Sequence, residues 1–456
     1  MGLKERLFKT KGKNKVAVIG LDGVPYDLIE DLVNAGKMPA LAEILKEGSP
    51  EKMKSSIPPV SSVAWTTFMT GVNPGKHGIY GFIDLKDYSY DPYFPNFTDI
   101  KSPLLWDSIA AHGKKTIAIN IPQTYPAKEI NGILISGFVA LDLQKAVYPP
   151  SFYPKLKKMD YRIDVDYQEA AEKKEEFFTD LFYTLKKRGE AIKYFLMKEQ
   201  WDLFIGVFTG TDRLHHYFWN EYENPQERYH QKFIDYYTQL DTIIGDLVDS
   251  LPGHCHLMIM ADHGFCALKQ EFFPNTWLKE KGYLKLKKDP PDSFSDIHSD
   301  SKAFILDPGR VYINLKGRMP EGCVKVGREY DDLREELMQG FMGISSPSEP
   351  SSPILERIFR KEELFSGPYL NKAPDLVLHG LSGYDIKGSM SKGYLFGKGR
   401  FTGMHTYSDA FLFLRGGDLK GNYDIVDLAP SILYLLGIPL PNHFDSKPLS
   451  SLSLLR

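Results

Sequence analysis

The sequence predicts an α/β fold with a largely parallel central sheet, helices on both of its faces, and an inserted cap or lid. Short apolar runs alternate with amphipathic segments at both ends of the chain, as in proteins built from strand–helix units. Polar residues follow the ends of several of these runs, where open parallel sheets place their sites. The region 267–400 interrupts the alternation with stretches rich in Ser, Pro and Asp, which predicts the insertion.

The first strand is predicted at residues 16–24, VAVIGLDGV, a β-branched apolar run that ends in Asp-Gly and so meets a turn. Residues 26–36 and 38–48 are amphipathic and each closes on glycine, which predicts two helices. The further elements come in chain order: a helix and a strand within 104–122, a strand at 132–138, a long helix within 170–200, and a strand followed by a loop in both 201–216 and 254–265.

The remaining elements divide the chain into parts. Within the insertion, residues 310–318 predict a strand and 329–344 a helix; residues 409–416 then return to the sheet, and 424–441 supply a last helix. We therefore predict a basic leader at 1–15, a catalytic α/β domain formed by 16–266 and 401–456, and a cap formed by 267–400.

Composition excludes several classes of protein. Charged residues make up 25% of the 456 residues and the net charge is -3, so no basic excess predicts a nucleic-acid polymer as partner. The three cysteines, Cys255, Cys266 and Cys323, form no spaced set, which favours reduced thiols and a cytoplasmic location. The leader lacks the apolar segment of a secretory signal, and no apolar run is long enough to predict a transmembrane helix.

Six Asp and His side chains stand near strand ends. Each has an ordinary structural role open to it, as a turn residue, a helix cap or a structural histidine. If they converge on one edge of the sheet, however, their like charges require a neutralising cation. The six residues are Asp22, Asp212, His216, Asp262, His263 and His405.

These residue types favour zinc, which takes nitrogen and oxygen ligands, with manganese as the alternative. Asp212 and His216 have the spacing of neighbours on one helical turn. Six ligands are too many for one tetrahedral ion with an open position. We therefore predict two divalent ions with three ligands each.

Ser61 and Ser62 precede an apolar helical run in PPVSSVAWTTFMTG. A serine at the start of this helix lies beside free backbone N–H groups, which suits either a cap or a nucleophile that attacks a phosphoryl group. Metal coordination would supply the activation that a serine hydroxyl lacks. The residues by themselves leave both roles open.

Several side chains are candidates for contact with a substrate. Arg213, His215 and Lys76 could offset charge on phosphoryl oxygens, although Arg213 could equally pair with a carboxylate. Trp65 belongs to a group of aromatic residues that either line a pocket or form core, and His77 is expected to hold a turn.

Taken in order, six motifs resemble the alkaline phosphatase superfamily, in particular its type I phosphodiesterase and nucleotide pyrophosphatase branch. They are GLDG (20–23), PPVSSVAW (58–65) with TGVNPGKHGI (70–79), TDRLHH (211–216), ADHG (261–264), GMH (403–405) and DIVDLAPSILYLLGIPLP (424–441).

The resemblance implies an alkaline phosphatase-like fold and a metal-dependent phosphodiesterase or pyrophosphatase that acts on small phosphorylated substrates. It implies Ser61, ten residues before Gly71, as the nucleophile. It assigns Asp22, Asp262 and His263 to the ion that also holds Ser61. It assigns Asp212, His216 and His405 to a second ion, which activates water.

Departures from the family pattern leave alternatives. Ala64 stands where nucleotide pyrophosphatases typically carry a phosphoryl-binding asparagine, which puts nucleotide specificity in doubt. The Cys-x-Pro-x-Arg motif of sulfatases is absent, and the large insertion follows ADHG rather than the nucleophile, unlike in cofactor-independent phosphoglycerate mutases. A phosphomonoesterase, a mutase of that type and a non-catalytic scaffold are the competing functions.

Overall fold

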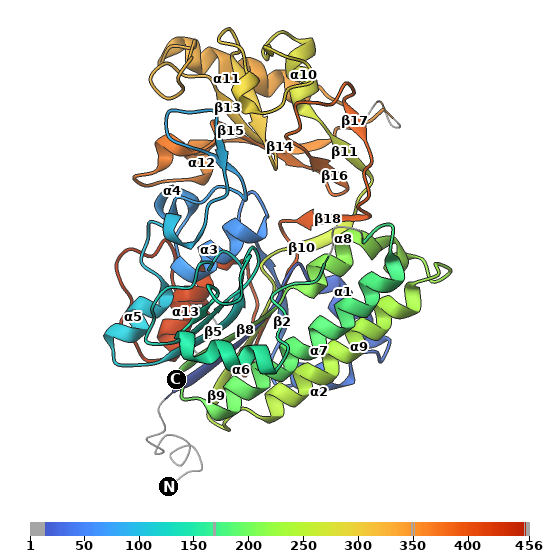
Figure 1. Cartoon of the computed structure of the whole chain (residues 1–456), viewed down its shortest axis with the longest axis vertical. Helices are drawn as coiled ribbons and strands as arrows, with labels where there is room; N and C mark the ends of the chain where they lie inside the picture. The colour runs from blue at the N-terminus through green and yellow to red at the C-terminus, as the bar shows by residue number, and fades with distance from the viewer. Residues whose placement is uncertain (1–13, 167–169, 348–349, 351, 451, 453–456) are drawn as a thin grey trace.

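A nine-stranded sheet runs through the larger part of the molecule (Figure 1). In sheet order its strands are β20 (Tyr423–Asp424), β2 (Pro50–Lys54), β19 (Ala410–Leu414), β9 (Cys255–Met260), β1 (Lys15–Leu21), β8 (Leu203–Phe208), β5 (Thr116–Ile121), β6 (Gly132–Ser136) and β7 (Val147–Tyr148). The five strands from β9 to β6 pair in parallel, whereas β19 is antiparallel to both neighbours and β7 is antiparallel to β6. The predicted largely parallel sheet is confirmed.

The computed structural model describes residues 14–166, 170–347, 350, 352–450 and 452. Residues 1–13 of the predicted leader lie outside this set, and Lys15 already begins β1.

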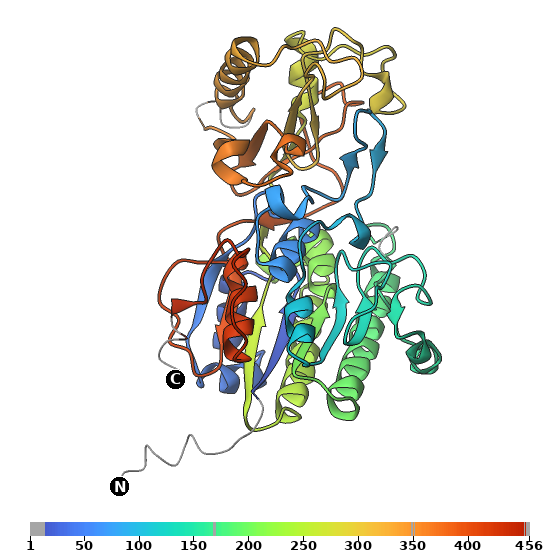
Figure 2. The ribbon, with the colours of Figure 1, turned by 90° about the vertical axis from the view of Figure 1, so that its left-hand side faces the viewer.

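Helices cover both faces of the sheet. One layer contains α7, α8 and α9, and the other contains α3, α5 and α13 (Figures 1 and 2). Every residue of β5 and β8 is buried, as expected for strands enclosed on both faces. The helices of this part are α1 (Tyr26–Asn34), α2 (Pro39–Leu45), α3 (Ser61–Thr70), α4 (Pro74–His77), α5 (Leu105–Ala111), α6 (Tyr153–Lys158), α7 (Lys174–Lys198), α8 (Gly210–Glu223), α9 (His230–Asp249) and α13 (Leu428–Leu435).

One local prediction is wrong. Residues 201–216 do not form a strand followed by a loop, because α8 begins at Gly210, directly after β8. Asp212 and His216 therefore lie on the first two turns of a helix, where residues four apart share a face.

A second, smaller core lies above the sheet in Figure 1 and includes Phe304, Leu337 and Ile386. Its strands form a sheet in the order β12 (Ala303–Leu306), β13 (Arg310–Ile313), β15 (Leu376–Gly380) and β14 (Leu355–Arg360), and its helices are α10 (Pro274–Glu280), α11 (Arg328–Met342) and α12 (Lys361–Leu364). A second small sheet beside it contains β16 (Tyr384–Ile386), β11 (Gln270–Phe272) and β17 (Phe396–Gly397). The boundaries 267 and 400 stay a prediction.

A hairpin of β3 (Asp84–Leu85) and β4 (Pro92–Tyr93) reaches from the larger part toward this second core (Figure 2). Between its two strands, Tyr90 belongs to the second core and donates a hydrogen bond of 2.6 Å to Asn314. Arg310 of β13 forms a buried ion pair with Asp84. The two parts are therefore joined by side-chain contacts as well as by the chain.

Cys255, Cys266 and Cys323 are free thiols. Among the described residues, no helix combines the length and the apolar character of a membrane span.

Candidate active site

The polar side chains predicted at the strand ends gather at one edge of the sheet. Asp22 follows β1 directly, Asp212 lies in the first turn of α8 after β8, and Asp262 and His263 follow β9. Because β1, β8 and β9 are parallel neighbours, their C-terminal ends lie side by side.

His405 reaches this edge through a separate strand pair. It lies in β18 (Gly403–Thr406), which pairs antiparallel with β10 (Gly264–Ala267) and places His405 opposite Phe265. The rings of His263 and His405 stack with their centroids 3.8 Å apart. A two-stranded ribbon thus joins ligand candidates that are far apart in the sequence.

Asp212, His216 and His405 form one group that could hold a metal ion. His405 Nε2 lies 3.0 Å from His216 Nε2 and 3.1 Å from Asp212 Oδ1, and His216 Nε2 lies 3.4 Å from the same oxygen. Ligand atoms about 2.0–2.1 Å from a tetrahedral zinc ion are separated by roughly 3.3 Å, so these spacings fit one ion.

A second group surrounds Ser61. Its hydroxyl donates to Asp22 Oδ1 at 3.2 Å and lies 3.2 Å from His263 Nε2, which in turn lies 3.4 Å from Asp262 Oδ2. Asp22, Asp212 and His263 also have ligand atoms close enough to share an ion. The carboxylate of Asp212 therefore belongs to both groups. The predicted division into two sets of three ligands assigns Asp212 to one ion only.

Hydrogen bonds outside the two groups fix the orientation of these side chains. The carbonyl of Pro59 accepts from His405 Nδ1 at 2.9 Å, and that of Gly264 accepts from His263 Nδ1 at 3.0 Å. Since a carbonyl can only accept, Nδ1 carries a proton in both rings, and Nε2 is the ring nitrogen that faces the site. Such outer contacts are typical of metal-binding histidines.

Two further contacts orient the carboxylates. Trp65 Nε1 donates to Asp22 Oδ2 at 3.0 Å, and the backbone N–H of Gly23 donates to Asp262 Oδ1 at 3.0 Å. The oxygens Asp22 Oδ1 and Asp262 Oδ2 are left facing His263.

The geometry fits cations. The Oδ2 atom of Asp262 is buried and has no hydrogen-bond partner, which is costly for a carboxylate oxygen unless an ion accompanies it. Burial, reinforced by the charges of Asp262 and Asp212, holds the pKa of Asp22 well above its usual range. Burial and the charge of Asp212 raise the pKa of Asp262 to about 7. Without a positive charge, this site therefore keeps protons on carboxylates that a metal would displace.

The histidines are affected differently. Burial lowers the pKa of His216 to about 4, and burial together with His405 lowers that of His263 well below its usual value. Burial also opposes ionisation of His405, but its hydrogen bond to Asp212 raises its pKa above the usual value. Burial opposes ionisation of Asp212 as well, but His216, His405 and Arg213 together hold its pKa well below the ordinary value. Imidazoles together with carboxylates are a ligand set suited to zinc or manganese.

Ser61 is the first residue of α3, and Val60 occupies the N-cap position. Among the described residues, no side chain caps this helix and the buried Oγ atom of Ser62 has no hydrogen-bond partner. The capping role is therefore wrong for both serines. The hydroxyl of Ser61 points instead at Asp22 and His263.

A cavity of about 170 Å³ opens onto Ser61, and the residues that line it are Asp22, Ser61, Phe82, Phe138, Thr209, Asp212, Arg213, His216, Tyr217, Phe401 and His405. Phe82, Phe138, Thr209 and Phe401 carry no sequence signal of a site, since single aromatic or hydroxyl residues in loops match no chemical motif. Thr209 contacts the interior of the protein, because its hydroxyl oxygen accepts a hydrogen bond of 2.7 Å from the buried Arg188.

Arg213 lines the cavity and is also paired with carboxylates. Its guanidinium lies 2.8 Å from Asp164 Oδ2 and 2.8 Å from Asp212 Oδ2, and it stacks over the ring of Phe138. Asp164 lies 49 positions away and no pattern in the sequence predicts the pair.

Two predicted substrate contacts are corrected by the structure. His215 is fully buried, and its ring nitrogens bond to the carbonyl of Gly23 at 2.8 Å and the hydroxyl of Tyr237 at 2.7 Å. It lies on α8 beside His216 but faces the core, because consecutive helical residues point in different directions. Trp65 is likewise fully buried and reaches the site only through Asp22.

The remaining two candidates lie in α4, the one-turn helix that follows α3. Lys76 forms an ion pair with Asp445, and neither residue lines the cavity. His77 is buried and lies 3.2 Å from the hydroxyl of Thr67, so it holds the turn as predicted.

Comparison with known proteins identifies the family of the chain. A family model described as "Type I phosphodiesterase / nucleotide pyrophosphatase" matches residues 16–408. No curated protein sequence matches the chain.

Solved structures share the fold at low identity. A phosphonoacetate hydrolase from Sinorhizobium meliloti 1021 in complex with phosphonoformate has a TM-score of 0.63 at 16% identity, over 93% of this chain and 96% of that one. Human ectonucleotide pyrophosphatase/phosphodiesterase 5 has a TM-score of 0.57 at 15% identity, over 97% and 99%. Wild-type alkaline phosphatase PafA has a TM-score of 0.60 at 15% identity, also over 97% and 99%. The fold is alkaline phosphatase-like.

Proposed function

Because the chain belongs to the type I phosphodiesterase/nucleotide pyrophosphatase family and is therefore a phosphoric ester hydrolase, we propose that it cleaves phosphodiester or pyrophosphate bonds through a covalent phosphoryl-serine on Ser61. One observation carries this proposal. The hydroxyl of Ser61 lies 3.2 Å from both Asp22 Oδ1 and His263 Nε2, at the edge where the six Asp and His side chains converge.

Two divalent cations complete the proposed site. Asp22, Asp262 and His263 would hold one beside Ser61, and Asp212, His216 and His405 would hold the other; zinc is the first choice and manganese the alternative. Such ions lower the pKa of a hydroxyl or water and neutralise charge on phosphoryl oxygens.

The protein groups then act in two steps. Ser61 Oγ forms a bond to phosphorus while the bond from phosphorus to the leaving oxygen breaks on the opposite side, and the leaving group takes up a proton. Water next forms a bond to phosphorus, the bond to Ser61 breaks, and the serine regains its proton. Asp22 orients the serine hydroxyl throughout, and Trp65 holds Asp22 in place.

The charge of the cavity favours a diester over a monoester. Of the side chains that line it in the described structure, Arg213 is the one Lys or Arg, and Asp164 and Asp212 already offset its charge. A phosphate monoester carries one more negative charge than a diester at neutral pH and would need a further cationic group.

The test is hydrolysis of bis-p-nitrophenyl phosphate after loading with zinc or manganese, with p-nitrophenyl phosphate in parallel. We expect the diester to be cleaved faster and EDTA to abolish the activity. Turnover of the monoester alone would make the protein a phosphomonoesterase.

The two adjacent serines provide a matched pair of variants for the nucleophile. Ser61→Ala should reduce turnover by at least about 10³-fold with metal content unchanged, whereas Ser62→Ala should keep it, because both hydroxyls are buried but only that of Ser61 faces the ligands. Undiminished turnover in Ser61→Ala contradicts the proposed intermediate.

A further inference from the structure

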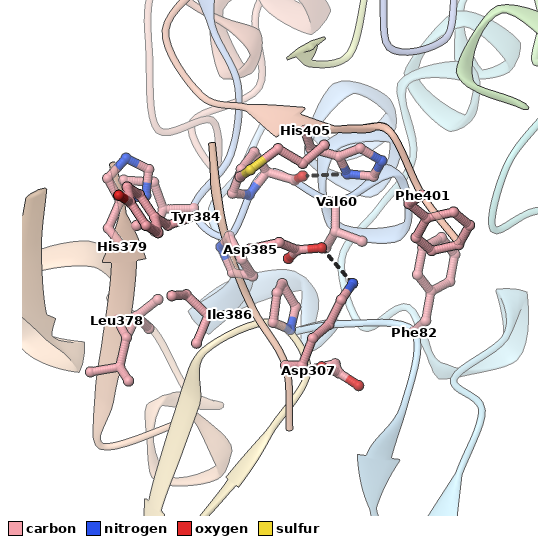
Figure 3. A pocket seen from close by; sticks show the side chains of 18 of the residues that line it. Val60, Phe82, Asp307, Leu378, His379, Tyr384, Asp385, Ile386, Phe401 and His405 are labelled. Carbon is pink, nitrogen blue, oxygen red and sulfur yellow. Dashed lines mark hydrogen bonds and ion pairs between the residues drawn. The ribbon is translucent and has the colours of Figure 1, made fainter. Parts of the chain in front are cut away.

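A larger cavity adjoins the one that opens onto Ser61. It has a volume of about 350 Å³ and shares Phe82, His216, Phe401 and His405 with the smaller cavity (Figure 3). We name it the side pocket and define it by its other lining residues, which are Ile57, Pro58, Pro59, Val60, Ile83, Asp307, Pro308, Val377, Leu378, His379, Gly380, Tyr384, Asp385, Ile386, Lys387 and Met404. Its size lies within the range of small-molecule sites.

The walls of the side pocket come from both parts of the protein. Residues 57–60, immediately before Ser61, form one wall, and the strands β15 and β16 form another (Figure 3). A molecule in this pocket would therefore contact both the sheet that carries the site and the insertion that covers it.

Apolar surface faces this space. Ile57, Pro59, Ile83, Pro308 and Phe401 are each only half-buried although they line a common cavity. Removing such surface from water is favourable, which makes an apolar occupant the natural complement of the pocket.

Two of the charged side chains in the wall of the side pocket neutralise each other, and a third accepts a hydrogen bond from the backbone. Lys387 and Asp385 form an ion pair of 2.5 Å with each other, and Oδ1 of Asp307 accepts a hydrogen bond of 2.5 Å from the backbone of Gly388. With Lys387 and Asp385 neutralised by each other, the apolar side chains dominate recognition.

The position of the side pocket indicates which part of a substrate enters it. It touches His216 and His405 of one ligand group but neither Ser61 nor Asp22 nor His263 of the other. In an in-line displacement the leaving oxygen departs on the side opposite the nucleophile. The side pocket is lined by His216 and His405 and not by Ser61, so it is open to a leaving group that departs on the side of these two histidines.

We propose that the side pocket binds the leaving group, and that the substrates are phosphodiesters whose leaving alcohol or phenol carries an uncharged, apolar body. This inference rests on the proposed function. The inference predicts a hydrophobic leaving group rather than a nucleotide or another strongly polar leaving group.

A substrate series tests the inference on the full chain loaded with zinc. Methyl 4-alkylphenyl phosphates with methyl, ethyl, propyl or butyl at the ring have leaving phenols of nearly equal acidity, so differences in kcat/KM report how the alkyl group is bound. We expect kcat/KM to rise about fourfold with each added methylene. A flat or falling series overturns the inference while leaving the proposed hydrolysis intact.

Variants test whether the rise in kcat/KM comes from binding of the alkyl group in the side pocket. Ile83→Asn should flatten the series, and Ile57→Asn, at another lining position, gives a second variant if the first does not fold. Val326→Asn is the matched control, because Val326 lies in the insertion with 76% of its surface exposed and lines no part of the pocket. A series that stays steep in both pocket variants places the alkyl group elsewhere and overturns the inference.

A binding measurement separates failure of the pocket from failure of the reaction. Titration calorimetry should find that 4-butylphenol binds the protein more tightly than 4-methylphenol, and that Ile83→Asn removes the difference. If no ester in the series is cleaved but this preference holds, the proposed function fails and the apolar pocket stands. If the two phenols bind equally, the pocket assignment fails whatever the activity.

Discussion

Replacing Asp262 with Asn should change stability in opposite directions with and without metal. The side chain is fully buried, and burial raises its pKa to about 7, whereas an aspartate in an unfolded chain titrates near about 3.9. In Asp262→Asn the amide oxygen can still accept from the N–H of Gly23, and the amide nitrogen can donate to His263 Nε2. The variant therefore removes the charge while preserving the contacts.

The sign and size of the stability change follow from the difference between the pKa of Asp262 in the folded protein and its pKa in the unfolded chain. Between the unfolded and folded pKa values the folded metal-free protein keeps a proton on Asp262 that the unfolded chain has lost, so stability falls as the pH rises through about 4 to 7. Because half of the folded molecules have already lost this proton at pH 7, the loss from pH 5 to pH 7 is less than two full units at about 1.4 kcal/mol each, or about 2 kcal/mol. Buried histidines such as His216 titrate in the same window with the opposite sign, but they do so in both proteins and are removed by subtraction.

Urea unfolding followed by tryptophan fluorescence in EDTA provides the measurement. The free energy of unfolding of Asp262→Asn minus that of the wild type should increase by about 2 kcal/mol between pH 5 and pH 7. With zinc added at pH 7 the order should reverse, because the wild type binds the ion more tightly and gains more stability from it. A difference that is independent of pH in EDTA, or no reversal with zinc, would refute the argument that this carboxylate is held for a cation.

Three further variants test individual assignments. His405→Ala should lower the zinc content from two ions per chain to one, as measured by elemental analysis, whereas His443→Ala should leave it at two; equal contents would exclude His405 as a ligand. Trp65→Phe removes the hydrogen bond to Asp22 and should lower kcat/KM by roughly 10- to 100-fold with its fold retained by circular dichroism; wild-type kinetics would show that Asp22 needs no such support. His215→Phe should cost about 1–3 kcal/mol of stability in urea and leave KM within about twofold, because both ring nitrogens bond within the core; a large rise in KM without loss of stability would restore the substrate-binding role.

The local pattern of residues was sufficient for the architecture. Apolar runs that are enclosed on both faces, such as β5 and β8, differ visibly from the amphipathic helices between them, and this difference predicts a largely parallel sheet. Parallel strands also bring the residues after their C-terminal ends to one edge of the sheet, so the sequence suffices to place Asp22 and Asp262 together. The family resemblance, carried by six motifs in order, is confirmed by the family match.

The local pattern of residues could not predict roles that depend on the direction in which a side chain points. His215 and His216 are adjacent and chemically identical, yet one faces the core and the other faces the site, because α8 begins at Gly210 rather than after a loop.

The sequence by itself determined which chemical groups the protein carries and the sheet edge at which most of them emerge, because hydrophobic periodicity and strand order are properties of neighbouring residues. Only the tertiary structure decided that His405 closes the group around Asp212 through the pairing of β10 with β18, and that Arg213 is paired with Asp164. It also decided that the insertion and the segment before Ser61 enclose an apolar space. These contacts join residues far apart in the chain, and the free energy that selects them comes from packing and charge in the folded state, which no local pattern records.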